Sequence, residues 1–204
     1  MISQDELKAK MEAYPRFNMV KSGSGNWVWY CLWAWFSPME SVCNIIEIGT
    51  SHGHSTAVLA TLCKSRGGKL VTIDTNRNGQ RIAHDFLEYL DLLDSVELIA
   101  GDSLEVLPDI VKRFKYQGAY IDGYHSYRQA SQELRLLAEN IDLDSDGFIA
   151  MDDVNYVHGN SGGDGGLPKL MAELKECGCA EEQTGQAKIY LTAGQRLAWL
   201  ERKL

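Results

Sequence analysis

The sequence lacks the paired cysteine spacing of a structural zinc site. Its five cysteines are Cys31, Cys43, Cys63, Cys177 and Cys179, and they form no pair of CxxC motifs. The Cys177-Gly-Cys179 spacing is too tight for an ordinary structural disulfide, and the total is odd. We therefore expect reduced thiols, as is usual in the cytosol.

The sequence also lacks an excess of basic residues and a long apolar run. Its formal net charge is −8 at pH 7, whereas surfaces that follow nucleic-acid phosphates or anionic membranes are normally basic. Residues 1–17 are charged and contain no apolar signal core. The most apolar stretch, Trp27 to Phe36, is about half as long as a bilayer-spanning helix. These absences predict a cytoplasmic protein that binds neither nucleic acid nor a membrane and that takes a small partner.

Short β-rich runs alternate with segments of helical period from about residue 44. We expect strands at residues 43–49, 69–74, 95–101, 116–122 and 147–153. We expect helices at residues 54–65, 80–92, 127–140 and 168–177, a short helix after residue 102, and a terminal hairpin around Ala193-Gly194. This alternation predicts an α/β fold, in which a mostly parallel, doubly wound sheet is covered by helices on both faces.

An N-terminal extension, residues 1–43, precedes this predicted catalytic domain of residues 44–204. Residues 4–14 have the pattern of a helix, and four tryptophans crowd residues 27–35. The aromatic segment could be a helix that covers the sheet. It could instead be a lid over a substrate or a contact in a homodimer, because aromatic clusters are common in pockets and interfaces.

A glycine turn follows the first predicted strand, in the sequence Glu47-Ile48-Gly49-Thr50-Ser51-His52-Gly53-His54-Ser55. Its G-x-x-x-G spacing differs from the G-x-G-x-x-G of dinucleotide-binding turns and from a P-loop. Glycine lets the backbone approach a ligand closely, and the helix that follows offers free N–H groups to a carboxylate. A tight turn without a ligand is the alternative.

Two further strand ends carry residues that could hold a nucleoside. Asp74 ends the second predicted strand, where an acid can accept hydrogen bonds from both ribose hydroxyls. Gly101-Asp102-Ser103 ends the third, where an adenine edge could bind. Asp102 and Ser103 could instead cap the next helix.

Together these motifs resemble the class I S-adenosylmethionine-dependent methyltransferases, over about residues 44–192. The resemblance implies a Rossmann-like methyltransferase fold with seven strands, the last of them antiparallel, and S-adenosylmethionine as cofactor. The residues that it assigns to the cofactor are Glu47, Gly49, Thr50, Ser51, Gly53, Ser55, Asp74, Asp102, Ser103 and Asp122.

Three carboxylates follow the fourth and fifth predicted strands. Asp122 ends the fourth, and Asp152 and Asp153 end the fifth. Neighbouring strand ends would bring these like charges together, and something must then neutralise them. Mg²⁺ binds carboxylate oxygens and keeps positions for water or substrate. Separately, Asp122 could be a turn residue or a helix cap, and Asp152-Asp153 an exposed acidic turn.

The pattern D-G-x-H-x-Y followed by G-x-x-x-x-D-D resembles the metal-dependent O-methyltransferases. Where the catechol branch has a lysine this chain has His125, and where that branch has an asparagine it has Asp153. It is closer to the branch that modifies antibiotic sugars, which often has Glu-Asp rather than Asp-Asp. The resemblance implies that Asp122, Asp152 and Asp153 hold Mg²⁺. His125 then takes a proton from a hydroxylated small-molecule acceptor, or else it only forms a local hydrogen bond.

Two other functions remain compatible with the motifs. One is a regulatory protein that binds S-adenosylmethionine without catalysis, and the other is a different transferase on the same fold. Methylation of nucleic-acid bases is disfavoured by the net charge and by the absence of an Asn/Asp-Pro-Pro-Tyr/Phe stretch. A glycine-rich segment at residues 158–167 could close over a substrate, or it could be a plain connection.

Overall fold

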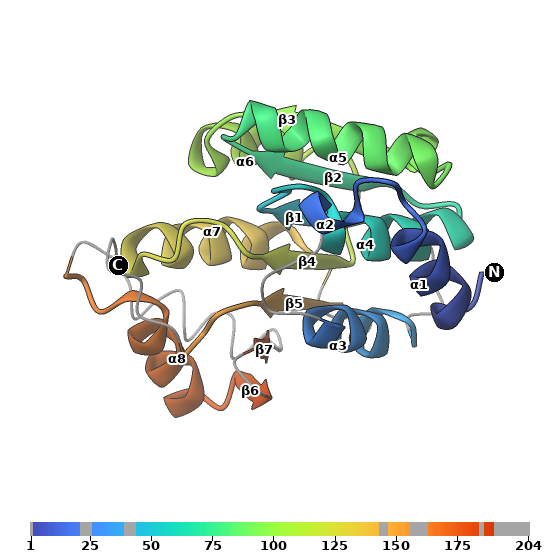
Figure 1. Ribbon diagram of the computed structural model, residues 1–204. Helices are drawn as coiled ribbons and strands as arrows, with labels where there is room; N and C mark the ends of the chain where they lie inside the picture. The colour runs from blue at the N-terminus through green and yellow to red at the C-terminus, as the bar shows by residue number, and fades with distance from the viewer. Residues whose placement is uncertain are drawn as a thin grey trace. The chain divides into compact units, whose positions relative to one another are not determined.

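The structure is a computed structural model that describes residues 2–20, 26–38, 44–142, 147–155, 163–183 and 186–189. Only the backbone is described at residues 26–29, 183 and 186–189. The chain divides into two compact units, Met1–Asp102 and Ser103–Leu204 (Figure 1).

In the part of the first unit that the structure describes, three parallel strands lie in the order β3-β2-β1. Their bounds are Ile45–Ile48 for β1, Leu70–Asp74 for β2 and Val96–Ala100 for β3. Every residue of β1 is buried, and so is β2 apart from Asp74, as is usual for strands covered on both faces. The turn after β1 lies beside the end of β2, because Gly49 N donates to the Ile73 carbonyl at 2.8 Å.

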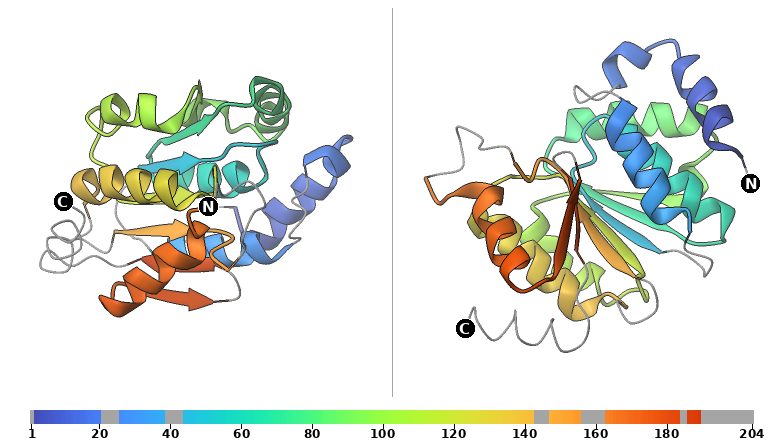
Figure 2. Two further views of the ribbon diagram at one scale, coloured as in Figure 1. Left: turned by 90° about the vertical axis from the view of Figure 1, so that its left-hand side faces the viewer. Right: turned by 90° about the horizontal axis from the view of Figure 1, so that it is seen from below.

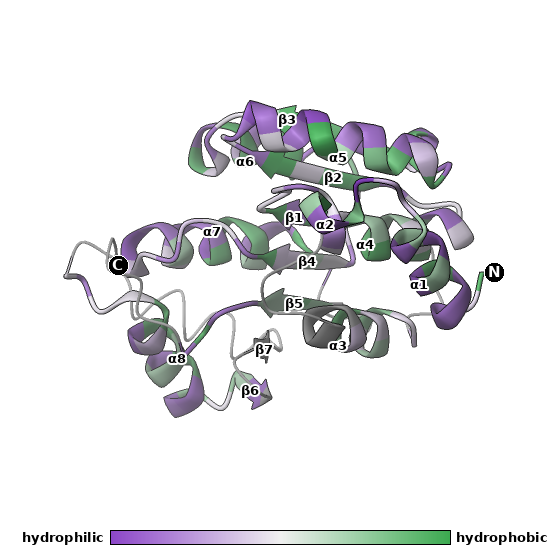
Figure 3. Cartoon of the chain, in the orientation of Figure 1, coloured by the Kyte–Doolittle hydropathy of each residue, from purple (hydrophilic) through white to green (hydrophobic). Residues whose placement is uncertain are grey.

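The helices of the first unit follow the predicted pattern with small shifts. Their bounds are Gln4–Glu12 (α1), Phe17–Val20 (α2), Asn26–Phe36 (α3), His54–Ser65 (α4) and Arg77–Tyr89 (α5), with a 3-10 turn, η1, at Leu93–Ser95. α5 begins before the predicted residue 80, because Asn76 accepts a hydrogen bond from Gly79 N at 3.0 Å and caps the helix. Figure 3 shows hydrophobic and hydrophilic residues alternating around α5, the pattern of a helix with one buried face.

The N-terminal extension packs on the helices of the first unit. Tyr14 contacts Phe86 and Tyr89 of α5, with ring centroids 5.0 and 5.1 Å apart. The aromatic segment forms α3, which lies against α4, and Arg66 after α4 donates to the carbonyl of Phe36 at 2.9 Å. The extension and the first part of the predicted catalytic domain therefore form one compact unit. Its role as a lid or a dimer contact stays a prediction.

The described residues of the second unit form four strands in the order β4-β5-β7-β6 (Figure 2). Their bounds are Gly118–Ile121 (β4), Phe148–Met151 (β5), Ala180–Gln183 (β6) and Gln186–Ile189 (β7). β4 and β5 are parallel and buried throughout, and β7 is antiparallel to both β5 and β6. The helices are α6 (Ser103–Ile110), α7 (Tyr127–Asn140) and α8 (Gly166–Glu176).

β6 and β7 form an antiparallel hairpin. The predicted turn at Ala193-Gly194 lies outside the described residues. Lys188 and Ile189 belong to β7, which pairs with β5 on one side and with the earlier strand β6 on the other. The hairpin predicted around Ala193-Gly194 stays a prediction.

The predicted α/β class with mostly parallel strands is confirmed. The predicted bounds of α4 and α7 agree with the structure at both ends. Among the described residues, no helix is long and apolar enough to cross a bilayer. The cytoplasmic location stays a prediction.

Candidate active site

The turn after β1 adopts backbone conformations that favour glycine. Gly49 and Gly53 have φ angles of 103° and 91°, and Ser51 between them has a φ of 47°. A Cβ atom at Gly53 would lie 2.9 Å from the Cβ of Ala83 in α5. Glycine at this position therefore lets the start of α4 approach α5, a packing reason that sequence reasoning did not find.

Asp74 fixes this turn to the end of β2. Its Oδ2 accepts a hydrogen bond from Ser51 N, and its Oδ1 accepts one from Asn76 N, both at 2.7 Å. Each carboxylate oxygen keeps a further lone pair. The predicted ribose contact of Asp74 is compatible with these bonds and stays a prediction.

A buried hydrogen-bond network lies beneath the glycine turn. Thr56 and Thr72 each donate to Oε2 of the fully buried Glu47 at 2.7 Å. Because the Thr72 proton is used in this way, the 2.7 Å contact between the Thr50 and Thr72 hydroxyls must have Thr50 as its donor. Gln80 then bonds Thr50 at 3.4 Å. Through Thr72, the network links Glu47 to Thr50 of the glycine turn.

Several members of this region escaped sequence reasoning. Thr72 lies between buried aliphatic residues of β2. A polar residue at such a position indicates a hydrogen-bond partner inside the protein. Gly79 lies in the first turn of α5, where a Cβ would meet the Ser51 carbonyl oxygen at 2.7 Å. A glycine inside a helical pattern indicates a close approach of this kind.

The remaining predicted cofactor residues differ in their surroundings. Ser55 and Asp102 are half-buried in the first unit. In the second unit, Ser103 is buried, and its hydroxyl donates to Glu133 and accepts from Gln129 Nε2 at 3.1 Å. The Ser103 hydroxyl is thus engaged within the interior of that unit, and its predicted adenine contact stays a prediction.

His54, the first residue of α4, is only 8% exposed. Burial lowers the pKa of His54 to about 4, so the ring is neutral near pH 7. Its ring centroid lies 6.2 Å from that of Phe17 in α2. His54 is therefore part of the packing between the extension and the glycine turn.

The second unit brings together an acidic cluster with one histidine. His125 Nε2 lies 3.5 Å from Asp122 Oδ1 and 3.9 Å from Asp153 Oδ2. One ligand atom from each of these residues lies within 4.8 Å of the others, a spacing that could hold a metal ion. The structure therefore brings three of the four predicted catalytic and metal residues into one group.

The fourth predicted residue, Asp152, is buried beside this group. Its Oδ2 accepts a hydrogen bond from Tyr120 Oη at 3.0 Å, and its Oδ1 accepts one from Asp153 N at 2.9 Å. The Tyr120 hydroxyl is also 3.5 Å from Asp122 Oδ2. Tyr120 escaped sequence reasoning, because a tyrosine in an apolar strand resembles an ordinary core residue.

Burial and mutual repulsion change the proton affinities of the cluster. Burial raises the pKa of Asp122 to about 6, and the charges of Asp152 and Asp153 add to this effect while His125 opposes it. Burial alone would lower the pKa of His125, but the interaction with Asp122 and the nearby carboxylate charges outweigh it and raise the pKa. The cluster is therefore a site that attracts protons or cations.

Two capping residues fix the backbone that follows His125. Ser126 accepts from Gln129 N at 3.1 Å. Asp164, which precedes α8, accepts from Tyr127 N at 3.1 Å and from Arg128 N at 3.0 Å. The start of α7, two residues after His125, is thus held by a side chain that is distant in sequence.

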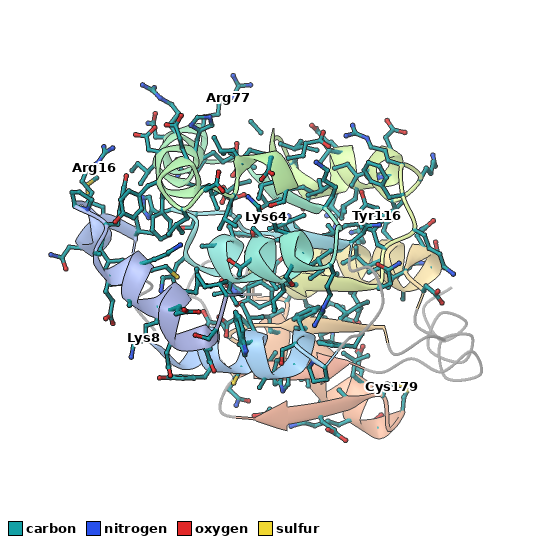
Figure 4. All side chains as sticks on the ribbon, turned by 90° about the vertical axis from the view of Figure 1, so that its right-hand side faces the viewer. Lys8, Arg16, Lys64, Arg77, Tyr116 and Cys179 are labelled. Carbon is teal, nitrogen blue, oxygen red and sulfur yellow. The ribbon has the colours of Figure 1, made fainter. Side chains whose placement is uncertain are left out.

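A cavity of about 860 Å³ in the first unit is lined in part by Gln80 of the buried network. Its lining includes three arginines, Arg16, Arg77 and Arg81, and the first two are labelled in Figure 4. The arginines are exposed, and Arg16 pairs with Asp85 at 2.9 Å. None of the predicted site residues lines this cavity.

Comparison with known proteins identifies the family. A family model described as a methyltransferase domain matches residues 46–154, more than half of the chain. The chain belongs to this methyltransferase family. The resemblance inferred from the glycine turn and the strand-end acids is thereby confirmed.

Two relatives of this methyltransferase are O-methyltransferases. The chain is 28% identical over 127 residues to catechol O-methyltransferase from Bos taurus, and the alignment covers 57% of this chain and 46% of the relative. It is 31% identical over 77 residues to caffeoyl-CoA O-methyltransferase 2 from Petunia hybrida, which covers 38% of this chain and 31% of that protein. The methyltransferase thus aligns with less than half of the length of either relative.

A solved structure shows the same fold. The O-methyltransferase TomG from Streptomyces achromogenes, which is involved in tomaymycin synthesis and was solved in complex with S-adenosylmethionine, aligns with a TM-score of 0.63. The alignment has 19% identity and covers 90% of this chain and 88% of that chain. The predicted Rossmann-like methyltransferase fold is thereby confirmed.

Proposed function

We propose that this methyltransferase transfers a methyl group from S-adenosylmethionine to a hydroxyl oxygen of a small molecule, with the help of a divalent metal. The observation that carries the proposal is the group of Asp122, His125 and Asp153, whose ligand atoms lie within 4.8 Å of one another. The names of the two relatives support oxygen as the acceptor atom. The TomG complex supports S-adenosylmethionine as the cofactor.

The first unit offers the chemistry that the cofactor needs. The start of α4 presents N–H groups that can bind the methionine carboxylate. Asp74 already accepts from the Ser51 and Asn76 backbones and has lone pairs left for ribose hydroxyls. The buried network on Glu47 holds Thr50 of the turn in place.

The second unit fits a hard divalent cation. Mg²⁺ prefers a few carboxylate oxygens, and Asp122, Asp152 and Asp153 lie together with their repulsion only partly relieved by His125. A bound Mg²⁺ would lower the pKa of the acceptor hydroxyl. We assign to the three aspartates the task of holding it.

His125 serves as the general base in this proposal. Its Nε2 takes the hydroxyl proton, and the carboxylates of Asp122 and Asp153 at 3.5 and 3.9 Å stabilise the resulting imidazolium. S-adenosylmethionine, when bound, would supply the methyl group from its sulfonium, and transfer to the acceptor oxygen would release S-adenosylhomocysteine. The raised pKa of His125 is consistent with this role.

The first experiment is a calorimetric titration with S-adenosylmethionine, followed by methyl-transfer assays on diol acceptors with Mg²⁺ or with EDTA. We expect one-to-one binding that Gly49→Arg abolishes, and transfer that EDTA abolishes. Gly67→Arg is the matched control, because Gly67 also has a positive φ of 69° but has no atom within 4 Å of its Cβ position. A folded protein that binds no S-adenosylmethionine would contradict the proposal.

A further inference from the structure

Tyr120 places a hydroxyl group between two of the carboxylates. It is fully buried in β4, two residues before Asp122 and therefore on the same side of the strand. Its Oη lies 3.0 Å from Asp152 Oδ2 and 3.5 Å from Asp122 Oδ2. Asp152 follows the neighbouring strand, where its N–H continues the ladder by donating to the Ile121 carbonyl at 3.0 Å.

A phenol has a single proton, and the shorter distance assigns that proton to Asp152. The other oxygen of Asp152 accepts from Asp153 N at 2.9 Å. Two donors, one from a side chain and one from the backbone, therefore hold the Asp152 carboxylate in a single orientation. Each oxygen keeps a second lone pair for a further ligand.

We infer that Tyr120 is a positioning residue for metal binding, which fixes Asp152 beside Asp122 through its hydroxyl group. The inference rests on the metal site of the proposed function. Carboxylates that ligate metals are themselves commonly hydrogen-bonded, and removal of such a partner typically weakens metal affinity about 10- to 100-fold. Phenylalanine has nearly the same shape without the hydroxyl, so Tyr120→Phe isolates the contribution of the hydroxyl group.

Tyr120→Phe in the full-length protein tests this role. The dissociation constant of Mn²⁺, used as a hard-cation probe, is measured by calorimetry for the wild type and the variant. We expect about 10-fold weaker Mn²⁺ binding and unchanged binding of S-adenosylmethionine. The control is Tyr116→Phe, which removes the hydroxyl of another fully buried tyrosine, located before the start of β4 (labelled in Figure 4). It should keep the wild-type affinity for Mn²⁺ whatever it does to thermal stability.

A second variant shows whether Tyr120 acts through Asp152. If it does, Tyr120→Phe changes the Mn²⁺ affinity by less than about 2-fold when Asp152→Asn is already present, because the two effects are not additive. Equal Mn²⁺ affinity in the wild type and Tyr120→Phe overturns the inference and leaves the proposed function intact. A wild type that binds S-adenosylmethionine but no divalent cation overturns both this inference and the metal part of the proposal.

Discussion

The acidic side chains of the two units have opposite surroundings. In the first unit, Glu47 is fully buried and accepts two hydroxyl hydrogen bonds at 2.7 Å. In the second unit, Asp122 is half-buried, and partial burial and the neighbouring acids raise its pKa to about 6 against the opposing effect of His125. Neutral donors from the protein stabilise the first carboxylate, whereas the second faces other carboxylates. The first unit thus holds a supporting hydrogen-bond network, and the second holds a site that can bind a cation and move a proton.

Replacement of His125 should have the largest effect on the reaction. We expect His125→Gln to lower kcat by about 10²–10⁴-fold, the usual contribution of a general base, with S-adenosylmethionine and saturating Mg²⁺ present. His84→Gln, on the exposed face of α5, is the control. The Mn²⁺ dissociation constant decides the role, because a loss of metal affinity as large as the loss of kcat would make His125 a metal ligand and not a base.

Acid should destabilise the first unit through His54. Burial lowers its pKa from 6.5 to about 4. Below pH 6.5 the unfolded chain binds a proton that the folded protein excludes, so the free energy of unfolding falls as the pH drops through this window. The loss should approach about 3 kcal/mol near pH 4. Urea denaturation of wild type and His54→Leu across this range tests it, and identical pH slopes would contradict the prediction.

Removal of one hydrogen-bond donor to Glu47 should lower the stability of the protein and leave its Mn²⁺ affinity unchanged. We expect Thr72→Val to lower the free energy of unfolding by about 2 kcal/mol, because a buried carboxylate loses a hydrogen bond. Thr61→Val is the comparison, since the buried Thr61 hydroxyl donates only to the Ala57 carbonyl within its own helix. Its loss should be smaller. Equal losses, or an altered Mn²⁺ affinity in Thr72→Val, would remove the distinction between the two units.

The smallest effect is expected at Asp164. Asp164→Ala removes the acceptor for two N–H groups at the start of α7 and should lower the free energy of unfolding by about 1 kcal/mol. Asp109→Ala, an exposed acid in α6, serves as control. A kcat that falls only a few-fold in Asp164→Ala would agree with indirect support of His125. An unchanged free energy of unfolding in Asp164→Ala would show that Asp164 does not stabilise the start of α7.

Strong local patterns made much of the fold predictable. The helical period of residues 127–140 places α7 at its observed bounds, and strand-end acids indicate where carboxylates gather. Long-range packing was not predictable in the same way. A Cβ at Gly53 would clash with Ala83, and Tyr120 donates a hydrogen bond to Asp152. Both features depend on how segments distant in sequence meet. The periodicity and motifs of a single sequence do not give the distances between residues that are far apart in the chain.

The bonds between Asp74 and the glycine turn also have a kinetic consequence. Because Asp74 accepts from Ser51 N and Asn76 N within the protein itself, the conformational entropy of this turn, about 1–2 kcal/mol per residue, is lost during folding and not on ligand arrival. A ligand that meets the protein then finds the turn already in its binding conformation in most molecules. Substitutions that loosen the turn should slow association, whereas substitutions that remove ligand contacts should shorten residence time.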